Sequence, residues 1–81
     1  MFKVAWTEKS LKDLDKLENL TSRRIIKGVD ELINNPCNKD IKKLKGADLY
    51  RLRVGDYRVI FEVYMAEIKI LKVGHRRNVY G

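Results

Sequence analysis

Apolar and polar positions recur with a helical period through most of the first half of the chain. Residues 2–6 alternate first, which predicts a short strand. Thr7, a residue type that caps helices, follows this strand, and leucines then recur at helical spacing at positions 11, 14 and 17. The pattern predicts a first amphipathic helix that ends near residues 18–20.

A second apolar stripe predicts a second helix, with Thr21 as its N-cap. The stripe consists of Ile25, Val29, Leu32 and Ile33. Asn34, Asn35 and Pro36 should end this helix, because proline removes a backbone donor and disfavours helical backbone before it. Two amphipathic helices with a tight connection predict an antiparallel helix hairpin.

The period changes to that of strands in the second half. Residues 37–48 read as a polar loop, with a short turn at 41–44 and a break at Gly46. Strands are predicted near 49–54 and 57–63, joined by the turn dipeptide Gly55-Asp56. After a turn at 64–66, a last strand should run from 67 to 73 and end at Gly74, although its alternation slips at Ile70-Leu71 and leaves its register open.

These elements predict one α+β domain over residues 1–81, with the order β-α-α-β-β-β. The helix hairpin should pack on one face of a twisted, mainly antiparallel sheet, because both apolar stripes need an apolar surface to cover. We assign Phe2 and Trp6 to the same core. The opposite face of the sheet is then expected to remain open.

The hairpin around Gly55-Asp56 raises a question about that open face. Counting outward from the turn pairs Val54 with Tyr57 and Arg53 with Arg58. One face is apolar and belongs to the core; it carries Tyr50, Leu52, Val54, Tyr57, Val59 and Phe61. The other face carries Arg51, Arg53 and Arg58, and like charges directly opposed destabilise a ladder by roughly 0.2–1 kcal/mol.

The distribution of charge indicates a polyanionic partner. Of the net charge of +7, residues 42–81 contribute +6, with ten Lys/Arg against four Asp/Glu. Such a basic half suits nucleic acid or an acidic polypeptide, while solubility alone is the plainer explanation. The three hairpin residues are all arginines, which favours bidentate contact with phosphate or carboxylate. The alternative is a solvated face that blocks edge-to-edge pairing.

The C-terminal segment adds further candidates. His75 is the only histidine and either transfers a proton or has a structural role, whereas Tyr80 either stacks on an exposed base or folds back on the core. Cys37 has no predicted chemistry, and the sequence offers no metal-ligand set and implies no cofactor. A single cysteine, no signal peptide and no membrane-length apolar run predict a cytoplasmic protein.

Three segments resemble the RelE-type toxins of the RelE/ParE superfamily. They are LKG at 44–46, the hairpin sequence LYRLRVGDYRVIFEV and the tail KVGHRRNVY, in that order. The resemblance covers nearly the whole chain and includes the β-α-α-β-β-β order. It implies a cytoplasmic toxin of a type II toxin–antitoxin pair, held silent by a small acidic RelB-like antitoxin. The toxin–antitoxin complex is then expected to bind operator DNA through the antitoxin.

The resemblance also implies an activity. RelE-type toxins enter the ribosomal A site and cut mRNA, with the 2′-hydroxyl attacking the adjacent phosphorus. By position, Arg51 and Arg53 would flank the scissile phosphate, Arg58 would stabilise the transition state and Arg76 would neutralise the leaving oxygen. Tyr80 would orient the mRNA, and Arg77, Lys43 and Lys45 are further candidate RNA-binding residues.

One departure from the family pattern concerns proton transfer. Relatives often carry lysine where this chain has Arg51, and arginine stays protonated. Catalysis would then rely on preorganised charge alone, or His75 would carry the proton. No acidic residue matches the carboxylate that some relatives use.

Two other functions remain open from the sequence. A ParE-type toxin shares the fold but poisons DNA gyrase by binding it, and a catalytically weak module could act mainly as co-repressor with its antitoxin. Cleavage on translating ribosomes separates the first from the nuclease. Toxicity on induction without antitoxin separates the second from both.

Overall fold

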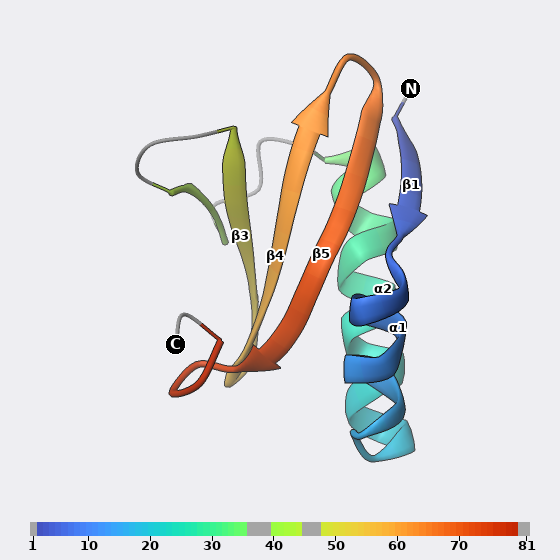
Figure 1. Cartoon of the computed structure of the whole chain (residues 1–81), viewed down its shortest axis with the longest axis vertical. Helices are drawn as coiled ribbons and strands as arrows, with labels where there is room; N and C mark the ends of the chain where they lie inside the picture. The colour runs from blue at the N-terminus through green and yellow to red at the C-terminus, as the bar shows by residue number, and fades with distance from the viewer. Residues whose placement is uncertain (1, 36–39, 45–47, 80–81) are drawn as a thin grey trace.

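The computed structural model describes residues 2–35, 40–44 and 48–79, which form two helices and one five-stranded sheet. The elements are β1 (Lys3–Trp6), α1 (Glu8–Asp15), α2 (Asn19–Asn34), β2 (Ile41–Lys43), β3 (Leu49–Val54), β4 (Tyr57–Tyr64) and β5 (Glu67–His75). The strand order is β1-β5-β4-β3-β2, with β1 parallel to β5 and every other pair antiparallel. Both helices lie on one side of the sheet (Figure 1), which confirms the predicted α+β architecture.

Helix α1 begins where the sequence predicts. The Thr7 hydroxyl oxygen accepts a hydrogen bond from the backbone N–H of Ser10 at 3.2 Å and so caps the helix. Leu14 is buried and Leu17 packs against the core, as their spacing predicts. Leu11 was predicted on the same stripe but is 49 % exposed, because the short helix turns this position away from the sheet.

Helix α2 begins earlier than predicted. Its N-cap is Glu18, which makes no side-chain capping bond, so the prediction of Thr21 as cap is wrong and Thr21 lies inside the helix. The predicted stripe is otherwise confirmed, with Ile25, Val29 and Leu32 buried against the sheet. Neither described helix is long and apolar enough to cross a membrane.

The central hairpin has the predicted register. Val54 is opposite Tyr57, Arg53 is opposite Arg58 and the pairing continues without a shift to Leu49 and Glu62. The face toward the helices carries buried Leu52, Val59 and Phe61, with the predicted Tyr50, Val54 and Tyr57 packed around them. Phe2 and Trp6 also pack against this core, as predicted.

Strand β2 was not predicted. Residues 41–44 were expected to form a turn in a polar loop, but Ile41–Lys43 pairs with β3 and extends the sheet by one edge strand. Three residues are too few for a recognisable alternation, and only Ile41 is apolar. Pro36, which was predicted to end the second helix, and Cys37 and Gly46 of the predicted loop lie outside the described residues.

Strand β5 is longer than predicted and contains an irregularity. Gly74 does not end it, since Gly74 pairs with Arg58 and His75 pairs with Tyr57. The register shifts between Ile60, opposite Lys72, and Phe61, opposite Ile70, so Leu71 is an extra residue. This bulge explains why the alternation of the sequence slips at Ile70-Leu71.

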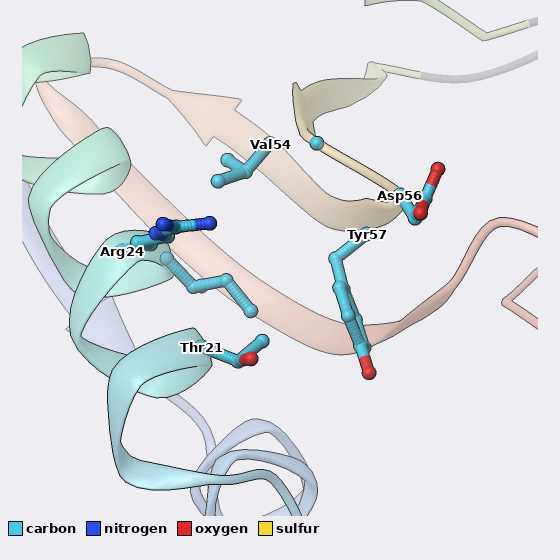
Figure 2. Close-up of a pocket in the computed structure, with 7 residues that line it drawn as sticks. Thr21, Arg24, Val54, Asp56 and Tyr57 are labelled. Atoms are coloured by element: carbon cyan, nitrogen blue, oxygen red, sulfur yellow. The ribbon is translucent and has the colours of Figure 1, made fainter.

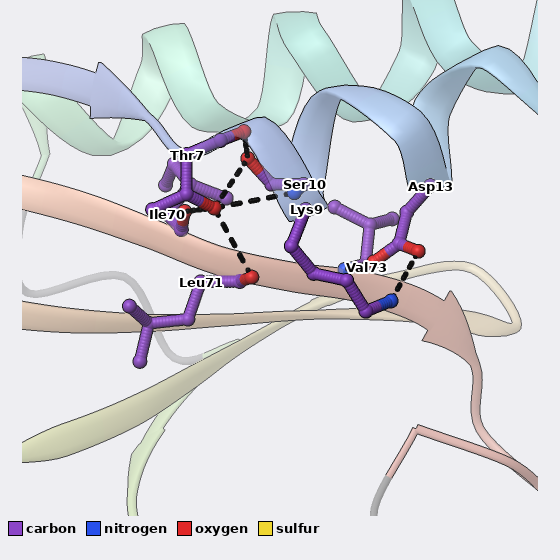
Figure 3. A network of polar contacts seen from close by, with 7 residues as sticks. All are labelled: Thr7, Lys9, Ser10, Asp13, Ile70, Leu71 and Val73. Carbon is purple, nitrogen blue, oxygen red and sulfur yellow. Dashed lines mark hydrogen bonds and ion pairs between the residues drawn. The ribbon is translucent and has the colours of Figure 1, made fainter.

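Helix α1 completes the hydrogen bonding of β5 beyond the end of β1. Strand β1 pairs only as far as Trp6 with Ile70. Beyond that point the Thr7 hydroxyl donates to the Ile70 carbonyl at 2.8 Å, and the buried Asp13 carboxylate accepts from the backbone N–H of Val73 at 2.9 Å (Figure 3). Side chains of α1 thus hold the end of β5 that leads to the C-terminal segment.

Candidate nucleic-acid interface

The face of the sheet that bears Arg51, Arg53 and Arg58 is here called the arginine face. Residues directly opposite each other in a sheet share a face, so Arg53 and Arg58 lie side by side and Arg51 shares the face with Ile60. Leu52 and Val59, which alternate with them, point into the core. The prediction of three arginines on the face away from the helices is therefore confirmed in register and burial.

An acidic residue, Asp40, reaches this cluster. The Arg53 guanidinium donates to the Asp40 carboxylate at 2.7 Å, and the Arg53 backbone N–H donates to the Asp40 carbonyl at 3.0 Å. Asp40 immediately precedes β2, so the sequence separation of thirteen residues hides this contact. The ion pair with Asp40 thus partly offsets the repulsion between Arg53 and Arg58.

The Arg58 guanidinium lies against the hairpin turn. One of its terminal nitrogens donates to the carbonyl oxygens of Gly55 and Tyr57, both at 2.9 Å. Gly55 itself has a φ of +58°, which glycine adopts without strain. The turn therefore orients Arg58, and among the described residues no carboxylate lies within ion-pair distance of it.

The β5 part of the arginine face is covered by the chain itself. Gly74 lies opposite Arg58, and a Cβ atom added there would lie 3.4 Å from the Cβ of Val79. Val79 is only 4 % exposed, and Ile60 on the same face is also 4 % exposed. The C-terminal turn thus folds back over the sheet and leaves the cations of β3 and β4 accessible.

Arg76 is held beside the hairpin turn. Its backbone N–H donates to the Asp56 carbonyl at 2.8 Å, and its Nε lies 3.9 Å from the Asp56 carboxylate. Its side chain is about half exposed, at 54 %. Arg76 is therefore brought to the same end of the sheet as Arg58, whereas Arg77 is exposed on the turn that follows.

His75 lies on the opposite face from the arginines. It is opposite Tyr57, whose ring it meets edge-on with centroids 5.6 Å apart and an interplanar angle of 79°. Its Nδ1 accepts a hydrogen bond from the backbone N–H of Arg77 at 3.2 Å. These contacts favour a structural role for His75. The alternative, that His75 transfers a proton during cleavage, would require its ring on the face that bears Arg58.

The two lysines of β2 point to opposite faces of the sheet. Lys43 is opposite Tyr50 and so shares the face of the core, whereas Lys42 is opposite Arg51 and belongs to the arginine face. Sequence reasoning chose Lys43 and missed Lys42, because the strand that sets their directions was not predicted. Lys45 and Tyr80, the other two candidates for RNA contact, lie outside the described residues.

A hollow of about 330 Å³ lies on the helix side of the hairpin turn. Figure 2 shows Thr21 and Arg24 of α2 facing Val54, Asp56 and Tyr57 across it. Val54 and Tyr57, which line it, pack toward the helices, and none of Arg51, Arg53 and Arg58 lines it. Within the described residues, no group of three His, Cys, Asp or Glu side chains is placed to hold a metal ion.

Comparison with known proteins assigns the family. The sequence model of a family described as "ParE toxin of type II toxin-antitoxin system, parDE" matches residues 4–80. The chain belongs to the RelE/ParE toxin superfamily. Among curated proteins it is similar to Toxin RelE3 of Methanocaldococcus jannaschii, with 36 % identity over 96 % of this chain and 94 % of the relative.

Solved structures of RelE/ParE members share the fold. The archaeal RelE–RelB complex from Pyrococcus horikoshii matches with a TM-score of 0.82 and 36 % identity, over 96 % of this chain and 98 % of that one. The RelB–RelE complex from Methanococcus jannaschii matches with a TM-score of 0.76 and 33 % identity, over 93 % of each chain. The resemblance to RelE-type toxins seen in the sequence is thereby confirmed.

Proposed function

We propose that this chain is the toxin of a type II toxin–antitoxin system and that it cuts mRNA in the ribosomal A site. The observation that carries the proposal is the arginine face, which places Arg51, Arg53 and Arg58 together on an open sheet surface. Arginine binds phosphate through two parallel hydrogen bonds and remains charged throughout a reaction. The choice of RNA cleavage as the reaction comes from the relationship to RelE-type toxins.

The proposed reaction is a transesterification within the RNA strand. The 2′-oxygen attacks the adjacent phosphorus and loses its proton, and the bond from phosphorus to the 5′-oxygen breaks. The products are a 2′,3′-cyclic phosphate and a free 5′-hydroxyl, which gains a proton. Arg58 is oriented by the turn before substrate binds, so it can stabilise the negative charge that builds on the phosphoryl oxygens.

Arg51, Arg53 and Arg76 would hold the phosphate and the leaving oxygen. Arg53 must exchange Asp40 for phosphate, and Arg76 must move away from Asp56 or keep it as an additional contact. With His75 on the other face, charge stabilisation and positioning supply the rate enhancement. Correct positioning of reacting groups alone can contribute on the order of 7–11 kcal/mol.

The ribosome is expected to supply that positioning. The exposed aromatic side chain on the described part of the arginine face, Tyr64, lies six residues along β4 from Arg58, too far to stack on a base beside the arginines. We therefore expect cleavage of mRNA on programmed ribosomes and little cleavage of the same RNA when free. Incubating the protein with both substrates at equal concentration tests this, and efficient cutting of the free RNA would contradict it.

The partner that silences the toxin would be a small acidic RelB-like antitoxin. The relatives from Pyrococcus horikoshii and Methanococcus jannaschii were solved in complexes with RelB, and the net charge of +7 suits an acidic segment. The family model is named after ParE, so gyrase inhibition is the second candidate function. Supercoiling by purified gyrase in the presence of the protein tests it, and inhibition without mRNA cleavage would replace the nuclease proposal.

A further inference from the structure

The direction of the lysines on β2 is fixed by packing. Ile41 is opposite Leu52 and packs against the core, together with Leu32 and Tyr50, around a small apolar hollow. Side chains alternate along a strand, so Lys42 must point to the arginine face and Lys43 back toward the helix side. The strand register and the burial of Ile41 thus independently place Lys42 on the arginine face.

Lys42 extends the arginine face in a row that has no described counter-charge. Lys42 is opposite Arg51, and within residues 2–35, 40–44 and 48–79 no carboxylate forms an ion pair with either of them. The neighbouring row differs, because Arg53 is paired with Asp40 there. The Lys42–Arg51 row therefore has no ion-paired carboxylate among the described residues, and Glu62, in the next row of the same face, lies 4.0 Å from Lys69.

The two rows are spaced like successive phosphates. They are two residues apart along β3, which corresponds to about 6.6–6.8 Å in a strand. We infer that Lys42 binds a phosphate next to the scissile one, on the β2 side of Arg51, so that the RNA backbone runs along β3 beside the β2 edge. This inference rests on the proposed function and adds a binding residue to the same site.

Edge protection is the alternative role of Lys42. Lysine on an edge strand hinders pairing with other chains, and β2 is an edge strand. That role needs charge on β2 but is served equally by Lys42 and Lys43. Of these two lysines, only Lys42 lies on the arginine face and can bind phosphate there. Alanine variants of Lys42 and Lys43 therefore distinguish the two roles.

The experiment measures binding of a labelled, 2′-O-methylated single-stranded RNA, which cannot be cleaved, over a range of salt concentrations. Each phosphate neutralised on a single strand contributes about −0.7 to the slope of log K against log salt. Lys42→Ala should weaken binding several-fold and make the slope less steep by about 0.7. Lys43→Ala should leave the slope unchanged, and Lys12→Ala on the exposed surface of α1 controls for the loss of one positive charge.

The outcomes separate the inference from the proposed function. Equal effects of Lys42→Ala and Lys43→Ala, or a wild-type slope in Lys42→Ala, would overturn the inference while cleavage by the wild type still stands. A wild-type protein that binds RNA through Lys42 but never cuts on ribosomes would overturn the function alone. Lys42→Ala that weakens binding only to an acidic peptide would assign this row to the antitoxin and overturn the RNA assignment.

Discussion

At the scale of single residues, the arginine face combines one guanidinium that is fixed with one that is exchangeable. Arg58 donates twice to the backbone of its own turn, whereas Arg53 is bound by a carboxylate that a phosphate can replace. A fixed group costs little reorganisation when charge develops in a reaction, and an exchangeable one can follow substrate arrival. Substitutions at Arg58 and Asp40 should therefore have different consequences.

Replacing Arg58 should separate activity from folding. Arg58→Ala removes the oriented guanidinium, and we expect it to abolish toxicity and cleavage. The free energy of unfolding should change by less than about 1 kcal/mol, because two lost hydrogen bonds are offset by relief of repulsion with Arg53. Chemical denaturation together with cleavage on ribosomes measures both; a large loss of stability would show that Arg58 is structural, and Arg58→Lys controls for charge.

Replacing Asp40 should strengthen anion binding. Asp40→Asn removes the competing carboxylate from Arg53, so the affinity for the 2′-O-methylated RNA should rise, most clearly at low salt. The cost in stability should be about 0.2–1 kcal/mol, because the ion pair is partly exposed. Weaker RNA binding by Asp40→Asn in a normally folded protein would mean that Asp40 organises the site rather than competing for it.

At the scale of elements, α1 secures the end of β5 through buried polar contacts. Asp13→Ala leaves the Val73 N–H without its acceptor and should cost about 1–3 kcal/mol in unfolding free energy. Asp13→Asn retains an acceptor oxygen and should cost less. Asp15→Ala, on the exposed side of the same helix, is the matched control, and equal losses at positions 13 and 15 would contradict a specific role for Asp13.

Gly28, where α2 contacts β3, should not tolerate alanine, although alanine is the better helix former. A Cβ added to Gly28 would lie 3.0 Å from the Cγ2 of Val54, whose branched side chain has little freedom to rotate away. Gly28→Ala should therefore destabilise the protein, although alanine is the better helix former by about 0.5–1 kcal/mol. Thermal melting should show the double variant Gly28→Ala/Val54→Ala losing less than the sum of the single variants; a stabilised Gly28→Ala would refute the tight contact.

The sequence predicted those elements whose pattern is long and local. The hairpin of β3 and β4, its register and the arginine face follow from strict alternation around Gly55-Asp56. Strand β2 is too short to show a period, and its pairing depends on Leu52 and Arg51 far along the chain. For that reason Lys42 and Asp40, the two additions to the site, were not predicted.

Caps and strand ends were predicted less well for a different reason. Thr21 has the residue type of an N-cap, but the connection after α1 is short and the helix already begins at Asn19. Gly74 has the residue type that ends a strand, but pairing with Arg58 continues β5 through it. The residue type alone thus predicts neither the start of α2 nor the end of β5.

At the scale of the whole molecule, excess positive charge makes stability depend on partners. An acidic peptide that resembles an antitoxin segment should bind only the folded protein and raise its stability by about 2.7 kcal/mol at a hundred times its Kd. The rise in melting temperature should shrink as salt is added, because the attraction is electrostatic. A shift that does not respond to salt would indicate that apolar contacts dominate the complex.

The position of β5 in the sheet has a consequence for synthesis. This strand lies between β1 and β4, so the strand that joins the first element to the rest of the sheet is made last. A nascent chain that lacks residues 67–75 has no pairing partner for β1 and no backbone for α1 to hold. The sheet therefore cannot close, and Arg76 cannot join Arg58 beside the hairpin turn, until residues 67–76 have left the ribosome, so the proposed site exists only after all five described strands have been made.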